Sequence, residues 1–286
     1  MTGQPDGGAD PVRRAAPVCY RHPDRETYVR CVRCDRPICG QCQHSASVGF
    51  QCPDDVAAAT RGARTPRTLA GGRVAPGAAR VTTGLVAVLV AMFGLQLVVG
   101  SRVELELGLQ PLAIATGEPY RLLTAALLHG SLLHLTFNAL ALLGFGPQLE
   151  QALGRLRFGA LCLLAALGGS VASYVASDPR VLGLGASGAI FGVAGGLLVV
   201  ARRLRHDVRG LLVVLALNLG LGFVVPGIDW RAHLGGFVVG AVFAAGLVYA
   251  PADRSRTFVQ ATVAVGLLVL LLGVTALRTA ALLPWL

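Results

Sequence analysis

The strongest constraint on the fold is a series of long apolar runs that fills the chain from residue 81 onwards. Each run approaches the ~20 residues that an α-helix needs to cross about 30 Å of hydrocarbon. Because a bilayer offers no hydrogen-bond partners to the backbone, runs of this kind are expected to be helical. The seven predicted spans cover residues 81–100, 121–147, 156–176, 184–203, 210–227, 231–250 and 258–277.

Composition supports a membrane protein with a small polar region in front of it. Only 14% of the residues are charged and the mean hydropathy is +0.63, whereas soluble domains carry about 25% charged residues. Residues 1–80 hold 19 of the 40 charged residues and six of the seven cysteines. We therefore predict an all-α polytopic membrane domain that follows a cysteine-rich N-terminal module.

The chain divides into five parts by composition. Residues 1–17 are polar and lack an apolar period, so they are expected to be disordered. Within the six-span core, the segment 101–120 between the first two spans is too polar to cross the bilayer. We expect it to lie in the membrane interface or to pack against the helix bundle. The parts are a tail at 1–17, a Cys/His module at 18–56, a flexible Arg/Pro/Gly linker at 57–80, a six-span core at 81–250, and a loop with a seventh span at 251–286.

Arginine placement predicts the orientation of the spans. All 25 basic residues are arginine and the formal net charge is +10. With a cytosolic N-terminus, and counting only the linker and the segments that join or follow the spans, thirteen arginines lie on the inner side and five on the outer side, as the positive-inside rule requires. This distribution favours a cell-membrane protein, with N-terminus inside and C-terminus outside, over a nucleic-acid-binding protein. No signal peptide is expected, and the Arg-, Ala- and Gly-rich composition indicates a bacterial source.

Few polar side chains lie within the predicted spans, and such residues are functional candidates by default. The second span holds His129, His134 and Asn138, the fourth opens with Ser187, and the sixth opens with His233. These three spans run in the same direction in the predicted topology. At 1.5 Å per residue, the five side chains fall at overlapping depths in the outer half of the membrane.

Glycines at four-residue spacing predict close helix packing around these side chains. Small residues at this spacing let helix backbones approach in lipid. Close packing of the fourth and sixth spans would bring Ser187 within hydrogen-bond reach of His233. The glycines are Gly188, Gly192 and Gly196 in the fourth span and Gly236 and Gly240 in the sixth.

These residues provide the parts of a serine hydrolase. A serine hydroxyl becomes a good nucleophile when a base such as histidine takes its proton, which gives Ser187 and His233 these two roles. The oxyanion formed by attack on a carbonyl needs fixed donors. His134 and Asn138 lie on one helical face and are candidates, together with the Ser187 N–H. No carboxylate is expected at this depth, so we predict a dyad.

Three motifs together resemble the rhomboid family of intramembrane serine proteases. They are H-x-x-x-N at His134–Asn138, G-x-S-G at Gly185–Gly188 and A-H-x-x-G at Ala232–Gly236, in the family's order. The resemblance covers roughly residues 81–250 and implies a rhomboid-like six-helix core, to which the seventh span is added. It also makes Arg121 the family's loop arginine and places Phe191 beside the catalytic histidine.

The resemblance implies an enzyme that cleaves transmembrane segments near the outer leaflet. It assigns Ser187 as nucleophile, His233 as base, and His134 and Asn138 to the oxyanion, with single-span membrane proteins as substrates and no cofactor for the chemistry. Two alternatives come from other classes: a silent rhomboid-like protein that binds transmembrane helices, and a transporter. The intact Ser187–His233 pair argues against the first, and the lack of a mid-membrane carboxylate or repeat argues against the second.

The N-terminal module carries a ligand pattern typical of zinc. Repeated C-x2-C pairs in a reducing cytosol indicate metal sites rather than disulfides, and zinc would supply the folding energy that so short a segment lacks. The spacing resembles a B-box-type zinc finger, in which alternate pairs share a metal, so one to two structural zinc ions are expected. We expect the module to bind a cytosolic protein partner, and the alternative is a folded cap that only stabilises the N-terminus. The resemblance implies one site made of Cys19, His22, Cys39 and Cys42, and a second made of Cys31, Cys34 and Cys52 with Asp55 or His44.

Overall fold

A computed structural model describes residues 16–62, 67–72, 74, 77, 79–225 and 227–285. The chain forms two compact units, residues 1–65 and residues 66–286, and each is described by itself. The predicted tail lies outside the described residues apart from its last two positions. Residues 63–66, 73, 75, 76 and 78 of the predicted linker also lie outside them.

The N-terminal unit has little regular structure and a core made mostly of cysteine. Its elements are η1 (Gly40–Cys42), the antiparallel pair β1 (His44–Ser45) and β2 (Phe50–Gln51), and α1 (Pro53–Gly62). Five buried cysteines pack around Ile38. Helix α1 passes the predicted module end at residue 56, so residues 57–62 are helical and not part of a flexible linker. Acidic residues in its first turn and Arg61 in its last favour this helix.

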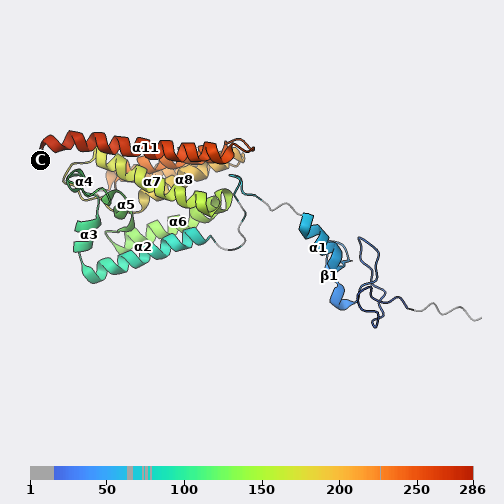
Figure 1. The fold of residues 1–286 in the computed structure, drawn as a ribbon. Coiled ribbons are helices and arrows are strands. Elements are labelled where there is room, and N and C mark those ends of the chain that lie inside the picture. Colours follow the sequence, from blue (N-terminus) through green and yellow to red (C-terminus); the bar gives the residue numbers. More distant parts are fainter. Residues whose placement is uncertain are drawn as a thin grey trace, which may run out of the picture. The chain divides into compact units, whose positions relative to one another are not determined.

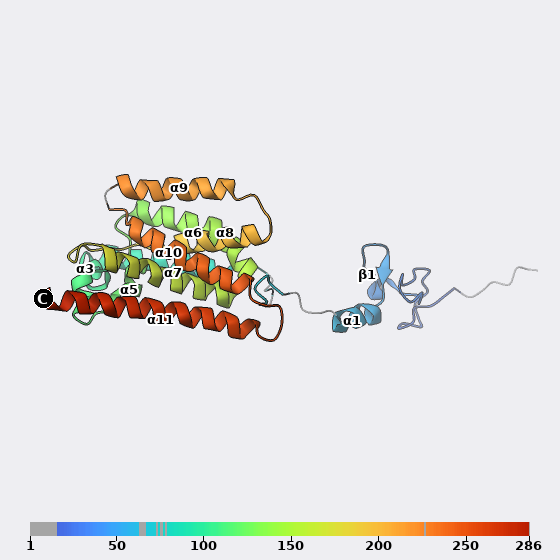
Figure 2. The ribbon, with the colours of Figure 1, turned by 90° about the horizontal axis from the view of Figure 1, so that it is seen from above.

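The membrane unit is a bundle of long helices (Figures 1 and 2). Five of its helices, α2, α6, α7, α10 and α11, are long and apolar enough to cross a membrane. Helices α8 and α9 have 17 and 16 residues, at the short end of what spans a bilayer. The elements are α2 (Arg80–Val99), α3 (Arg102–Leu107), α4 (Pro111–Ala115), α5 (Arg121–Thr124), η2 (Ala125–Leu127), α6 (Leu132–Leu153), α7 (Arg155–Ala176), α8 (Ser187–Arg203), α9 (Arg209–Val224), α10 (Trp230–Val248), α11 (Arg256–Leu282) and η3 (Leu283–Trp285).

Six of the seven predicted spans match these helices to within five residues at each end, and the second does not. The prediction began it at residue 121, whereas α6 begins at Leu132. The chain leaves helical geometry at Leu128, and the Ser131 side chain caps α6 by accepting a hydrogen bond from the His134 N–H. Such a side-chain cap fixes a helix start. The preceding residues form α5 and η2, which pack on α7.

Helix α8 lies at the centre of the bundle, between α6, α7 and α10. A Cβ on Gly236 of α10 would collide with the Gly188 carbonyl, and a Cβ on Gly240 with the Gly192 carbonyl. The residue numbers of these glycines increase in the same direction along both helices, so α8 and α10 run parallel. This arrangement confirms the close packing that the glycine spacing predicts.

The segment 101–120 packs against the bundle, as expected. Leu109, Ile114 and Ala115 are buried with side chains of α7 and α11. The buried Arg121 fixes this segment, because its guanidinium donates to the Gly108 carbonyl at 2.9 Å and to the Leu105 carbonyl at 2.6 Å. The Arg121 guanidinium and the Tyr120 hydroxyl, in that order, lower the pKa of Glu118, which accepts a hydrogen bond from each.

Buried polar side chains complete the helix ends. The carboxylate of Glu150 on α6 accepts hydrogen bonds from the Val81 and Thr82 N–H groups at 3.0 and 2.9 Å, and from the Thr82 hydroxyl at 2.9 Å. It therefore caps α2, whose own N-cap residue offers no side-chain acceptor. A carboxylate at this position also faces the positive end of the helix dipole.

Residues 67–72, which the sequence assigned to the flexible linker, also have a fixed place against the bundle. The Thr68 hydroxyl donates to the Leu153 carbonyl at 3.2 Å, and the Ala70 carbonyl accepts a 3.0 Å hydrogen bond from the buried Gln260 of α11. The backbone groups here find partners on the ends of α6 and α11, which composition alone does not reveal. The predicted linker is thus interrupted by an ordered segment.

We expect Gly240→Ala to lower the free energy of unfolding, because the new methyl group meets the Gly192 backbone and forces α8 and α10 apart. Overpacking of this kind costs about 1–3 kcal/mol, more than the ~1 kcal/mol gain in helix propensity. Reversible unfolding in detergent micelles measures the effect. Gly266→Ala in α11 is the matched control, since its Cβ would meet nothing within 4 Å; equal stability of the two variants would contradict the packing argument.

Candidate active site and metal centres

The predicted nucleophile and base lie on the two helices that pack most closely. Ser187 is the first residue of α8, and His233 lies in the first turn of α10. A Cβ on Gly188, the residue after Ser187, would lie 3.2 Å from the carbonyl oxygen of Ala232, the residue before His233. The backbone contact between α8 and α10 therefore brings these two positions together.

The His233 ring is fixed by an aromatic partner on the serine helix. It stacks on Phe191 with ring centroids 4.1 Å apart and an interplanar angle of 10°. Phe191 follows Ser187 by four residues and so lies on the same face of α8. The His233 residue as a whole is 6% exposed. Among the described residues, no hydrogen bond joins the Ser187 hydroxyl to the ring, and the His233 Nδ1 has no partner.

Asp229 is the carboxylate nearest in sequence to His233, and it bonds to the backbone of α10 and not to the His233 ring. Asp229 caps α10 by accepting hydrogen bonds from the Arg231 and Ala232 N–H groups at 3.1 and 3.3 Å. It fixes the start of the helix just before His233, while the Nδ1 atom of that histidine remains unbonded in the described part of the chain. Asp229 therefore does not bond to the His233 ring in the described part of the chain.

The His134 ring lies close to Gly185, as does the Ser187 hydroxyl. A Cβ on Gly185 would lie 3.0 Å from the His134 Nε2 and 3.8 Å from the Ser187 Oγ. The φ of Gly185 is +132°, a conformation that favours glycine, and its N–H donates to the Ala125 carbonyl at 2.9 Å. The loop before Ser187 is thus fixed in a conformation in which the His134 imidazole and the Ser187 hydroxyl both lie next to Gly185.

Asn138 lies one turn further along α6 than His134 and is 6% exposed. Its amide nitrogen is buried and, among the described residues, has no hydrogen-bond partner. A buried unpaired donor costs about 1–3 kcal/mol. Asn138 thus retains a buried hydrogen-bond donor that nothing in the described part of the chain uses.

His129, which was also a candidate from the sequence, is joined through its backbone to helix α2 and, through Gln96, to α3. Its backbone N–H and carbonyl both bond to the Gln96 side chain of α2 at 3.0 Å, and Gln96 also donates to Glu104 of α3 at 2.8 Å. The His129 ring meets the His134 ring edge to face at 5.1 Å. Sequence reasoning did not identify Gln96, although a glutamine inside an apolar run is itself a signal.

The first group of predicted metal ligands is arranged as zinc requires. In a tetrahedral site with usual bond lengths, sulfur and nitrogen ligands lie about 3.5 Å apart. The His22 Nδ1 lies 3.7 Å from the Cys19 Sγ and 3.4 Å from the Sγ atoms of Cys39 and Cys42. The four residues therefore fit one tetrahedral ion.

The second group joins Cys31, Cys34, Cys52 and Asp55, with all ligand atoms within 4.8 Å of one another. The Cys34 and Cys52 sulfurs are 3.7 Å apart. Hydrogen bonds from Cys34, Cys31 and Cys52 lower the pKa of Asp55 to about 2, so it is a carboxylate at neutral pH. His44 lies on β1, exposed and outside this group, and of the two alternatives the geometry brings only Asp55 to the site.

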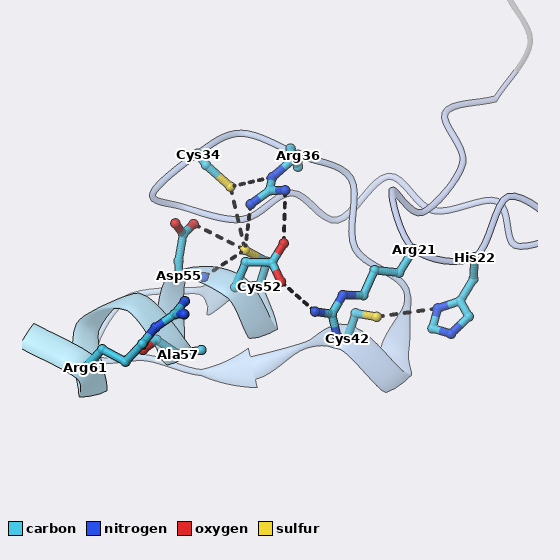
Figure 3. A network of polar contacts seen from close by, with 10 residues as sticks. Arg21, His22, Cys34, Arg36, Cys42, Cys52, Asp55, Ala57 and Arg61 are labelled. Atoms are coloured by element: carbon cyan, nitrogen blue, oxygen red, sulfur yellow. Dashed lines mark hydrogen bonds and ion pairs between the residues drawn. The ribbon is translucent and has the colours of Figure 1, made fainter.

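Arg36 supports the second group from outside, as Figure 3 shows. Its Nε donates to the Cys34 Sγ at 3.2 Å, its Nη2 to the Cys52 Sγ at 3.5 Å, and its Nη1 to Asp54 at 3.1 Å. Three thiolates and a carboxylate carry four negative charges, two more than a divalent ion neutralises. A guanidinium at this position offsets part of the excess and orients the ligands.

Comparisons with known proteins agree with the membrane unit. A family model described as the rhomboid domain matches residues 116–250. The chain is 44% identical over 140 residues to the rhomboid protease GluP of Bacillus subtilis and 37% identical over 135 residues to RHOMBOID-like protein 5 of Arabidopsis thaliana. These matches cover 47% and 44% of this chain, but only 27% and 43% of those relatives.

A shorter relative is covered more fully. YdcA of Bacillus subtilis, whose name marks it as a candidate rhomboid protease, is 34% identical over 138 residues, which span 45% of this chain and 69% of that protein. The long apolar helices and these matches define a multi-pass membrane protein. The chain belongs to the rhomboid family.

Proposed function

We propose that this protein is an intramembrane serine endopeptidase. The observation that carries the proposal is that Gly185 lies against both His134 and Ser187, while the α8–α10 backbone contact joins the residues next to Ser187 and His233. Asn138 lies one turn along α6 from His134 and has a buried, unpartnered amide nitrogen among the described residues. Relatives named as rhomboid proteases support the same activity. The proposed substrates are single-span membrane proteins, cut near the outer leaflet of the cell membrane, with the N-terminus of this chain in the cytosol.

The chemistry would proceed in two steps. His233 takes the hydroxyl proton of Ser187 as the Ser187 oxygen bonds to the scissile carbonyl carbon. The Asn138 amide, His134 and the Ser187 N–H donate to the resulting oxyanion. His233 returns the proton to the leaving amine as the peptide bond breaks, and water then releases the acyl group from Ser187 by the same route.

We expect a fluorophosphonate probe to label the wild type in membranes and to fail on both Ser187→Ala and His233→Ala. Ser187→Ala removes the proposed nucleophile and His233→Ala removes the proposed base, and in both variants the new side chain is smaller than the old one. Cleavage of a model single-span substrate should disappear in parallel. Labelling that persists in Ser187→Ala would mean another nucleophile. A folded wild type that neither labels nor cleaves would favour a silent helix-binding protein, and a proton-dependent flux would favour a transporter.

A second prediction concerns Asn138. Because its amide nitrogen has no partner in the described residues, Asn138→Leu should leave stability nearly unchanged while kcat falls about 10²-fold or more, the usual effect of losing one oxyanion donor. The measurements are cleavage rates and thermal unfolding of the same samples. Asn218→Leu is the control, since Asn218 is exposed and bonds only to the Val214 carbonyl of its own helix. Unfolding of Asn138→Leu would indicate a structural role.

For the N-terminal unit we propose a structural zinc module with two ions that docks a cytosolic protein. Its support is the fit of both ligand groups and a core that consists mostly of those ligands. With four protein ligands at each site, the ions would have no open position for catalysis. Zinc therefore supplies folding energy here and takes no part in the proteolytic chemistry.

Metal analysis of the purified full chain under reducing conditions should find two zinc ions per chain. Asp55→Ala should lower this to about one, because three ligands hold zinc less well than four, and Asp55→Cys should restore it. Asp24→Ala is the control: the Asp24 side chain is 76% exposed, lies 3.9 Å from the Arg25 side chain and belongs to neither ligand group. A wild type without zinc, or equal loss in Asp24→Ala, would overturn this assignment.

A further inference from the structure

Two arginines face the same pair of glycines where α7 and α11 begin. Arg157 lies in the first turn of α7, and Arg256 is the first residue of α11. A Cβ on Gly72 would lie 2.9 Å from an Arg157 Nη1, and a Cβ on Gly71 would lie 2.8 Å from the Arg256 Cδ. Since the glycines are adjacent, the two positive groups share one small surface.

Each guanidinium is fixed through its Nε and leaves its terminal nitrogens available. The Arg157 Nε donates to the Gln260 Oε1 at 2.8 Å, and the Arg256 Nε donates to the Pro251 carbonyl at 3.0 Å. In the part of the chain that the structure describes, no other hydrogen bond reaches either group and no carboxylate lies within 4 Å. Asp253 accepts hydrogen bonds from Ser255, and these bonds and, to a smaller extent, the charge of Arg256 lower its pKa, but Asp253 forms no ion pair with Arg256.

The helix starts add to this positive potential. Neither α7 nor α11 has a side-chain cap or an acidic residue in its first turn. Helix α2, in contrast, receives the Glu150 carboxylate at its start. Unsatisfied N–H groups and the positive end of the dipole favour an anion at a helix N-terminus.

We propose that Arg157, Arg256 and the starts of α7 and α11 form a binding site for a phosphate group, as carried by the headgroup of an acidic phospholipid. Guanidinium groups bind phosphate oxygens with paired, charge-assisted hydrogen bonds. The ends of membrane-spanning helices lie at the level of the headgroups, and basic pockets between such helices bind anionic lipids. Inorganic phosphate shares this chemistry but lacks the acyl chains.

The site also has a consequence for the segment before the bundle. Gly71 has a φ of +84° and Gly72 leaves room for Arg157, so this turn lets the chain pass directly over both arginines. Repulsion between the two guanidinium groups opposes that arrangement when no anion is present. A bound phosphate removes the repulsion and stabilises residues 67–72 against the ends of α6 and α11.

The test uses the full chain, freed of native lipid in neutral detergent. Thermal unfolding is followed during titration with phosphatidylglycerol, with phosphatidylcholine, or with inorganic phosphate against chloride at equal ionic strength. Native mass spectrometry counts the lipid retained. The variants are Arg157→Gln and Arg256→Gln, and the control is Arg254→Gln, an exposed arginine of the same loop. Two single variants guard against a folding defect in one of them.

Phosphatidylglycerol should raise the unfolding temperature of the wild type and of Arg254→Gln, whereas phosphatidylcholine should not. Each site variant should bind phosphatidylglycerol about fivefold more weakly, as expected for losing one arginine near a membrane surface. Protection by inorganic phosphate as well would show that the headgroup alone suffices, and protection by the lipid only would show that acyl chains contribute. No protection of the wild type, or equal protection of both site variants, would overturn the proposal.

Discussion

The contact between the backbones of α8 and α10 is the interaction on which the rest of the membrane unit depends. In lipid, apolar side chains gain little by leaving their surroundings, so helices associate through close packing and polar contacts. Here Gly236 and Gly240 rest on the carbonyl groups of Gly188 and Gly192. This distance is open only to glycine, and it sets the separation of Ser187 and His233 on the same two helices.

Polar groups in the membrane unit fall into two kinds. Glu150, Gln96 and Gln260 are buried and bonded, and each joins elements that are distant in sequence. The side chains of Asn138 and His233 are also buried, yet each has a nitrogen that finds no partner among the described residues. An unpaired buried donor weakens the fold, and natural proteins tolerate such violations at functional sites. His129, whose backbone bonds to Gln96, is also buried and has two ring nitrogens without a partner among the described residues. The roles that we propose for Asn138 and His233 therefore rest on their positions near Ser187 and not on unpaired nitrogens alone.

Sequence could predict those features that follow from periodicity and spacing. Apolar runs indicated the long helices, and glycines four residues apart indicated which faces meet, because both properties are local. The predicted start of the second span was wrong, since the apolar run continues through Leu128, where the preceding helical turn ends, and the Ser131 side chain caps the start of α6 only after that break. The roles of Glu150 and Gln260 were out of reach, because their partners at Thr82 and Ala70 are 68 and 190 residues away.

The two units obey different folding constraints. In the N-terminal unit, the buried side chains are mostly cysteines of the two ligand groups, and Ile38 is the one buried aliphatic residue of that cluster. So small a core cannot offset the conformational entropy of ordering the segment. Its ligands must also lose protons to bind metal, which makes its stability dependent on pH and on free zinc. The membrane unit carries its stability in helix contacts, and none of the proposed zinc ligands lies within it. The proposed zinc ligands and the proposed catalytic residues thus belong to different units, and each unit has its own source of stability.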